Sequence, residues 1–261
     1  MRPAIRIENV HKRFGDVEAI AGITADIEAG RLTGVVGPDG AGKTTLVRMM
    51  AALMKPSVGR IEVVGRDVAS EAAAIHQLTG YMPQRFGLYE DLSVMENLEL
   101  YARLRGRSDE ARAASFDRLL HFTRLEPFKS RLAGRLSGGM KQKLGLACAL
   151  MARPPVLLLD EPSVGVDPVS RQDLFQMVEE LTQEGMAVVW STGYLDEAER
   201  CDSVLLLDHG QLAYAGPPGE LTAHVAGRSV LVTGTRGERR RVLSEALALE
   251  GVRDGVIQGD A

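Results

Sequence analysis

The chain has 261 residues, which is enough for one large or two small domains with a hydrophobic core. Apolar residues make up 45% and charged residues 25%, so disorder is not expected. The net charge of −4 excludes a global attraction to nucleic acid or to an anionic membrane, and any polyanion must be bound locally.

Neither a membrane span nor a disulfide framework is predicted. The longest apolar stretch, residues 144–152, is about half of the roughly 20 residues that a transmembrane helix needs. The first residues do not lead into the apolar run of a secretory signal. Cys148 and Cys201 have no second ligand-type residue at metal spacing, which disfavours zinc sites. We therefore expect a protein of the reducing cytoplasm.

The first third of the chain predicts strands, a glycine loop and a helix. Strands are expected at residues 4–10 and 17–27, and the continuous apolar run 32–36 leads into the glycine loop. A helix at 43–53 stops before a proline. Because the glycine loop lies between a strand and a helix, the spacing of its glycines, described below, can be interpreted as a binding motif.

The middle of the chain predicts a small helical subdomain at about residues 90–150. Ser93 and Glu96 have the spacing of a capping box for a helix through Leu104, and residues 109–122 carry apolar side chains at helical spacing. A further helix is expected at 138–152.

Strands and helices alternate after this subdomain, which predicts a largely parallel sheet with helices on both faces. The expected elements are strands at 156–159, 186–190 and 204–207, a helix that starts at Asp167-Pro168, a helix at 194–200 and a hairpin turn at 208–210. Beyond residue 225 we expect a strand at 229–233 and a helix at 239–249.

A phosphate-binding loop is predicted before the first helix. The pattern G-x-x-x-x-G-K-[ST] is matched by Gly37-Pro38-Asp39-Gly40-Ala41-Gly42-Lys43-Thr44, with Thr45 next to it. Backbone N–H groups and the helix N-terminus would surround phosphate oxygens, Lys43 would reach the β- and γ-phosphates, and the Thr44 hydroxyl would ligate Mg²⁺. A glycine-rich turn capped by lysine is the alternative, but the position between strand and helix favours a nucleotide.

Two adjacent carboxylates end the strand at 156–159. Because the carboxyl ends of parallel strands open onto the ligand crevice, Asp160 would face the Mg²⁺ bound at Thr44 through a water molecule. Glu161 would point toward the γ-phosphate and could orient or deprotonate a water. Two solvated acids at a strand end are the alternative. Together with the phosphate loop, the pair indicates hydrolysis of a nucleoside triphosphate.

A second anion-binding surface is predicted at Leu136-Ser137-Gly138-Gly139-Met140-Lys141-Gln142. A hydroxyl, two glycines and a helix N-terminus offer donors to phosphate, although a capped helix would explain the same residues. The chain thus carries two anion sites that could serve one nucleotide.

In order and spacing, four motifs resemble those of the ATP-binding-cassette (ABC) ATPases over about residues 4–225. They are the phosphate loop, Gln84, the signature at 136–142, and 159–162 followed by Asp167. In that family two cassettes pair head to tail, and each ATP lies between one phosphate loop and the other cassette's signature helix. The resemblance implies an α/β P-loop NTPase fold with a RecA-like parallel-sheet core, an N-terminal antiparallel β subdomain and a helical subdomain.

The resemblance also implies roles for single residues. Ser137, Gly138 and Gly139 would complete the partner's ATP site, and Asp167 would make a contact across the dimer. Gln84 would join the γ-phosphate and Mg²⁺ to the transmembrane subunits, which places it among the catalytic and metal-binding residues.

Apolar side chains at two places resemble family contact sites. Phe14 aligns with the aromatic residue that stacks on adenine, although an aromatic after a strand is more often part of a core. Phe86, Leu88 and Tyr89 would receive a coupling helix from a transmembrane partner, although a packed loop would show the same residues.

One position departs from the family pattern. Where the family has a histidine that contacts the γ-phosphate and the catalytic glutamate, this chain has Gly193. Such contacts are worth most in the transition state, so their loss should slow hydrolysis more than binding. We expect a cassette that binds ATP well and hydrolyses it slowly, unless Ser191, Thr192 or a water replaces the histidine.

The wider sequence is similar to the first cassette of bacterial ABC-2-type multidrug exporters. We expect an ATPase that binds ATP and Mg²⁺, pairs with a second cassette and powers export through ABC-2-type permease subunits at the cytoplasmic face of the membrane. Residues 1–225 would form the cassette, and 226–261 an extension or the start of a linker to a second cassette. A nucleic-acid partner is not expected. The alternatives are a soluble ABC protein acting on ribosomes or DNA, which the short span between Lys43 and Leu136 disfavours, and a regulatory cassette with little turnover.

Overall fold

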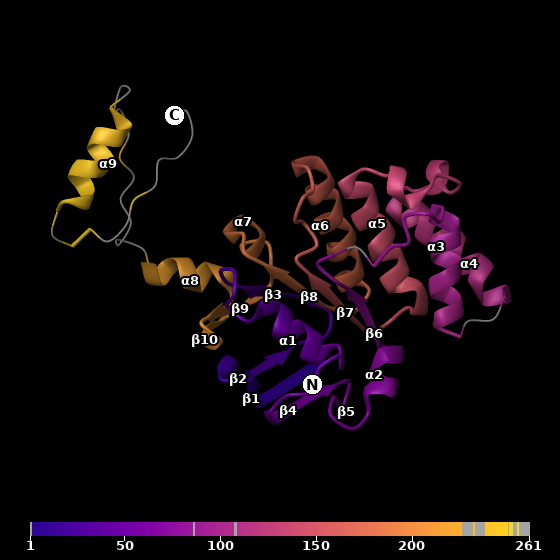
Figure 1. Cartoon of the computed structure of the whole chain (residues 1–261), viewed down its shortest axis with the longest axis horizontal. Helices are drawn as coiled ribbons and strands as arrows, with labels where there is room; N and C mark the ends of the chain where they lie inside the picture. Colours follow the sequence, from indigo (N-terminus) through magenta and orange to yellow (C-terminus); the bar gives the residue numbers. More distant parts are fainter. Residues whose placement is uncertain are drawn as a thin grey trace. The chain divides into compact units, whose positions relative to one another are not determined.

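The computed structural model describes residues 2–85, 87–106, 109–225 and 238–249, together with Val232, Gly251, Val252 and Gly255. It divides into two compact units, Met1–Leu221 and Thr222–Ala261. The first unit contains two sheets and their helices (Figure 1).

The larger sheet has six strands in the order β10-β9-β3-β8-β7-β6. All neighbouring pairs are parallel except β9 and β10, which form the predicted hairpin. The strands are β3 (Leu32–Val36), β6 (Thr79–Met82), β7 (Val156–Asp160), β8 (Ala187–Thr192), β9 (Ser203–Asp208) and β10 (Gln211–Gly216). The prediction of an α/β fold with a largely parallel sheet is confirmed.

The smaller sheet is antiparallel and has the strand order β2-β1-β4-β5. Its strands are β1 (Ile5–Phe14), β2 (Val17–Ile27), β4 (Val58–Val63) and β5 (Arg66–Asp67). The strand β1 runs past the predicted end at residue 10, because register shifts in its pairing with β2 carry the two strands through to the turn at Phe14.

Most of the described helices lie where the sequence predicted them, whereas α2 and α8 were not predicted. Ser93 and Glu96 form the predicted capping box at the start of α3. The helices are α1 (Lys43–Met50), α2 (Ala72–Leu78), α3 (Val94–Leu104), α4 (Asp109–Thr123), α5 (Gly138–Ala149), α6 (Pro168–Gln183), α7 (Leu195–Ala198), α8 (Pro218–Val225) and α9 (Arg239–Leu247).

Two hydrophobic cores lie on the two faces of the parallel sheet. The strand β7 is buried along its whole length, and its side chains alternate between the cores. Leu157 and Leu159 belong to the core that includes residues of α3 to α6. Val156 and Leu158 belong to the core shared with α1 and the antiparallel sheet. Figure 1 shows α1 between the two sheets. The cores thus fix the carboxyl ends of β3, β7 and β8 beside one another.

Some predicted boundaries are wrong for local reasons. The helix α1 ends at Met50 rather than at residue 53, because Ala52 adopts a left-handed φ of 54°. The helix predicted at 138–152 tightens after Ala149 into a 3-10 turn at Leu150–Ala152. The strand predicted at 229–233 falls on residues outside the described part of the chain, apart from Val232.

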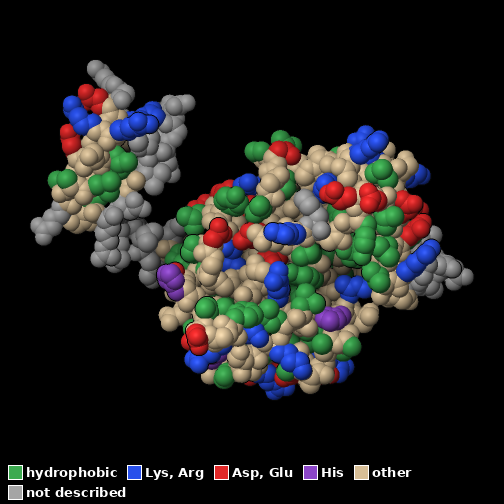
Figure 2. Space-filling model, viewed as in Figure 1, with side chains coloured by type: hydrophobic (Ala, Val, Ile, Leu, Met, Phe, Trp, Pro, Cys, Tyr) green, Lys and Arg blue, Asp and Glu red, His purple; other side chains and the backbone are tan. Residues whose placement is uncertain are grey.

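Within the described ranges, no helix has both the length and the apolar character needed to cross a bilayer. In the same ranges, His, Cys, Asp and Glu side chains form no group of three or more that could hold a metal ion. Both cysteines are buried and free. On the face drawn in Figure 2, Lys and Arg side chains are interspersed with Asp and Glu.

Candidate nucleotide-binding site

The loop at residues 37–42 joins β3 to α1 at the carboxyl edge of the parallel sheet. Two of its glycines are required by close backbone approaches, since a Cβ would lie 2.4 Å from the Leu207 carbonyl oxygen at Gly37 and 2.7 Å from that of Ala19 at Gly42. Gly42 is the N-cap of α1 and supplies no side-chain cap. The first N–H groups of α1 therefore have no capping side chain, as a helix terminus that binds an anion requires.

The side chain of Lys43 is folded into this loop and is only 4% exposed. Its Nζ donates to the carbonyl oxygens of Gly37 at 2.8 Å and Pro38 at 3.0 Å, and it lies 3.2 Å from Glu161 Oε1. A buried cation is thus held at the mouth of the loop by carbonyl dipoles and a carboxylate. Asp39 is exposed and lies farther from the ammonium, at 3.9 Å.

Asp160 ends β7 and is completely buried. Its Oδ1 accepts hydrogen bonds from Thr44 Oγ1 at 3.0 Å and from Ser191 Oγ at 2.9 Å. Among the described residues, its Oδ2 is buried and has no hydrogen-bond partner. Burial raises the pKa of the Asp160 carboxyl, against the lowering effect of the two hydroxyl donors.

The side chain of Glu161 contacts two other predicted residues, Lys43 and Gln84. Its backbone has a φ of 49°, which is rare for a residue with a Cβ. Its Oε2 accepts a 2.6 Å hydrogen bond from Gln84 Nε2, while Oε1 faces Lys43. The left-handed turn therefore directs the Glu161 side chain away from Asp160 and between the cation of the loop and the amide of Gln84.

The signature residues lie against α6. Ser137 is the N-cap of α5, and its hydroxyl accepts from Met140 N at 3.3 Å. A Cβ on Gly139 would lie 2.2 Å from Ser170 Oγ, and Asp167 caps α6 by accepting from Ser170 N. The described neighbours of Ser137 and Gly139 thus lie in α5 and at the start of α6, rather than in this chain's phosphate loop.

Phe14 ends β1 and is 47% exposed, and the ammonium of Lys12 lies 5.2 Å from the centroid of its ring. The ring belongs to neither hydrophobic core, so the alternative interpretation of Phe14 as a core residue is wrong. An exposed aromatic face is available for stacking.

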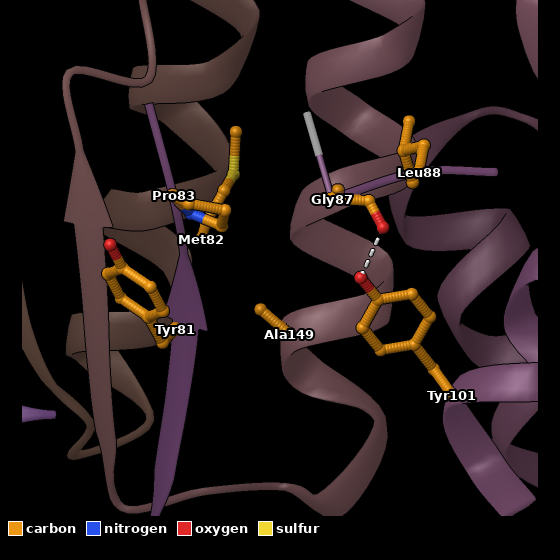
Figure 3. A pocket seen from close by; sticks show the side chains of 8 residues that line it. Tyr81, Met82, Pro83, Gly87, Leu88, Tyr101 and Ala149 are labelled. Atoms are coloured by element: carbon orange, nitrogen blue, oxygen red, sulfur yellow. Dashed lines mark hydrogen bonds between the residues drawn. The ribbon is translucent and has the colours of Figure 1, made fainter. Parts of the chain in front are cut away.

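Beyond Gln84, a small apolar pocket lies between β6, α3 and α5 (Figure 3). Tyr101 closes one side and donates a 2.6 Å hydrogen bond to the carbonyl oxygen of Gly87. Leu88 lines the pocket, Tyr89 is 55% exposed, and Phe86 lies outside the described residues. Leu88 is therefore packed as the packed-loop interpretation expects, while docking of a coupling helix on exposed Tyr89 stays a prediction.

Two sets of contacts at the site were not predicted from the sequence. Ser191 bridges the two carboxylate residues, since its hydroxyl also accepts from Glu161 N at 2.9 Å. Lys141 on the signature helix forms a 2.6 Å ion pair with Glu90, which follows the pocket. Ser191 could have been noticed in the sequence as a polar residue at the carboxyl end of a predicted buried strand. Its position opposite Asp160, however, follows only from the register of the strands.

The parallel sheet, the phosphate loop and the paired acids define a P-loop nucleoside-triphosphatase cassette. The ABC transporter family model matches residues 20–164, and the chain belongs to this family of ABC ATPases.

The chain is 58% identical to the probable multidrug ABC transporter ATP-binding protein YbhF of Escherichia coli K12, over 98% of this chain and 44% of the relative. It thus spans less than half the length of that relative. It is 39% identical to the daunorubicin resistance ATP-binding protein DrrA3 of Streptomyces coeruleorubidus, over 86% of this chain and 71% of the relative.

A solved dimeric ATP-binding cassette in a post-hydrolysis state, bound to ADP and Pi, superposes with a TM-score of 0.75 at 26% identity. The match covers 82% of this chain and 98% of that structure. These comparisons confirm the resemblance and the P-loop fold that the sequence predicted.

Proposed function

We propose that this chain is the ATP-binding and ATP-hydrolysing cassette of an exporter that works through separate ABC-2-type permease subunits. The observation that carries the proposal is the meeting of Lys43, Gln84 and Glu161 at the edge of the sheet, beside Thr44 and Asp160. Relatives named for multidrug transport, daunorubicin resistance and Nod factor export support an exporter of small molecules.

The residues present fit a magnesium ion. Asp160 Oδ2 is a buried carboxylate oxygen without a partner among the described residues, and a hard cation is the ligand that such an oxygen prefers. Thr44 and Asp160 would hold the ion, the latter through a water, and Gln84 would contribute its amide oxygen while its Nε2 bonds Glu161. When bound, Mg²⁺ supplies positive charge to the β- and γ-phosphates.

In this proposal different residues of the chain bind the phosphates, activate the water, contact the permease-facing segment and stack on the base. Residues 37–45 bind the phosphates through backbone N–H groups, and Lys43 exchanges its loop carbonyls for phosphate oxygens. Glu161 orients or deprotonates the attacking water, and Gln84 connects this glutamate to the segment that faces the permease. Phe14 stacks on the base.

Slow hydrolysis belongs to the proposal because Gly193 offers no side-chain donor, and the proton of the Ser191 hydroxyl, one of the two candidate replacements, is already donated to Asp160. The Ser191 hydroxyl is engaged by Asp160 and Glu161, and Thr192 Oγ1 accepts from Tyr194 N at 3.0 Å. Gly193 itself lies beside the phosphate loop, since its Cβ position is 3.5 Å from the Gly37 carbonyl oxygen. A regulatory cassette with little turnover is therefore the second candidate, favoured by Gly193.

Pairing with a second cassette would use Ser137, Gly138 and Gly139 for the partner's nucleotide and Asp167 for a contact across the dimer. We place the cassette at residues 1–225 and an extension or linker start at 226–261, which the division into compact units after Leu221 supports. Exposed Tyr89, in the segment after Gln84, would receive a coupling helix, and the complex would lie at the cytoplasmic face of the membrane.

Mild detergent purification of the full protein tests this proposal. A multi-span membrane protein should copurify, whereas cosedimentation with ribosomes would favour a soluble ABC protein. Lys43→Met should abolish ATP binding in the same preparation, because it removes the cation of the phosphate loop. Retained ATP affinity in that variant would contradict the assignment of the loop.

A further inference from the structure

The side chain of Ser191 is a buried polar group near the carboxyl end of β8, after the apolar residues 187–190. All six residues of β8 are buried, and Ser191 is 0% exposed. A buried hydroxyl is costly unless its donor and acceptor functions are both used. Here both are used: the hydroxyl donates to Asp160 Oδ1 and accepts from Glu161 N, each at 2.9 Å.

The register of the parallel sheet creates this bridge. Asp160, the last residue of β7, is paired with Ser191 on β8. On the other side of β8, Ser191 is paired with Val35 of β3, two residues before the phosphate loop. The hydroxyl therefore lies at the centre of the three strands that end at the nucleotide site.

Two consequences follow for the neighbouring carboxylates. Asp160 Oδ1 receives two hydroxyl donors, from Thr44 and Ser191, so the carboxylate cannot rotate without breaking both bonds. Its other oxygen is left without a partner among the described residues. The Ser191 hydroxyl also accepts from the buried peptide N–H of Glu161, a residue with a left-handed φ of 49°. Without this bond the N–H would be left without that partner.

We propose that Ser191 is a positioning residue for both acids: it leaves Asp160 Oδ2 as the oxygen for the divalent cation and holds Glu161 turned toward the phosphate loop. The inference rests on the proposed nucleotide site and deepens it. Ser191 acts through Asp160 and Glu161 and touches neither nucleotide nor cation.

The test compares ATP affinity with excess Mg²⁺ and with EDTA, by titration calorimetry on the full chain. In Ser191→Ala the affinity with Mg²⁺ should fall about tenfold, the effect of losing one charge-assisted hydrogen bond, while the affinity in EDTA should stay unchanged. Ser163→Ala is the matched control, because it removes a buried hydroxyl that has no hydrogen-bond partner among the described residues. That variant should match the parent in both conditions.

An equal loss of affinity with Mg²⁺ and with EDTA would mean a general structural role, and no loss would mean no role; either result overturns the inference. Should Ser191→Ala fail to fold, Ser191→Cys keeps a similar volume with only a weak donor and should show the same Mg²⁺-specific loss. A parent chain that binds no ATP would overturn the proposed function together with this inference.

Discussion

Restoring a side chain at Gly193 should raise the rate of ATP hydrolysis. The structure has room for it, because a Cβ there meets only the Gly37 carbonyl oxygen, at an ordinary contact distance of 3.5 Å, and the backbone is not left-handed. A histidine at this position would place a donor beside the phosphate loop, where negative charge develops during γ-phosphoryl transfer.

The magnitude follows from the value of one such donor. Removing a preorganised donor from a transition state costs about 10²–10³ in kcat in enclosed sites. Gly193 is exposed, so water screens the contact, and we expect Gly193→His to raise kcat by about tenfold.

Phosphate release at saturating ATP measures this effect, with KM determined in parallel. Gly193→Ala is the control, because it fills the Cβ position without adding a donor and should leave kcat unchanged. Equal kcat values for the histidine variant and the parent would refute the reasoning, and so would an increase that alanine reproduces.

Three further changes test other parts of the site. Burial raises the pKa of Asp160 above its ordinary 3.8, so the parent's free energy of unfolding should fall as pH rises from 3.8 through the raised pKa. Asp160→Asn should remove this fall and raise the melting temperature of the nucleotide-free chain, yet lose Mg²⁺-dependent ATP binding. A lower melting temperature in this variant would contradict the prediction. Phe14→Ala should raise the Kd for ATP about fivefold, near 1 kcal/mol, because the ring is half exposed; equal Kd values in direct titrations would exclude the stack. Ser137→Arg should leave ATP affinity unchanged and stop turnover of the paired cassettes, as judged by nucleotide binding and phosphate release, and unimpaired turnover would exclude the signature role.

Local sequence signals were sufficient for the elements that carry the phosphate loop. The run at 32–36, the glycine spacing and the helix formers after Lys43 each act over a few residues, and β3 and the start of α1 lie where they predicted. The same holds for the capping box of α3, whose two hydrogen bonds join residues three apart.

Contacts between distant segments could not be derived in this way. Gln84 and Glu161 are 77 positions apart, and their hydrogen bond depends on β6 and β7 being neighbours in the sheet. The resemblance named both residues without giving this contact. The sequence named Ser191 only as a possible replacement for the histidine, and its contacts with Asp160 and Glu161 were not predicted, since they follow from a strand register that no periodicity encodes. The short elements β5 and α2 carry too few residues for a clear pattern.

The central claim is that Glu161 drives hydrolysis at a site that binds ATP without it. Measuring ATP binding and phosphate release on one preparation of the full protein tests it most directly, with Glu161→Gln beside the parent and exposed Glu184→Gln as the charge-matched control. The account predicts that Glu161→Gln keeps its ATP affinity and loses at least about 10² in turnover, the lower end of what general base catalysis supplies. Turnover equal to that of the parent would contradict it.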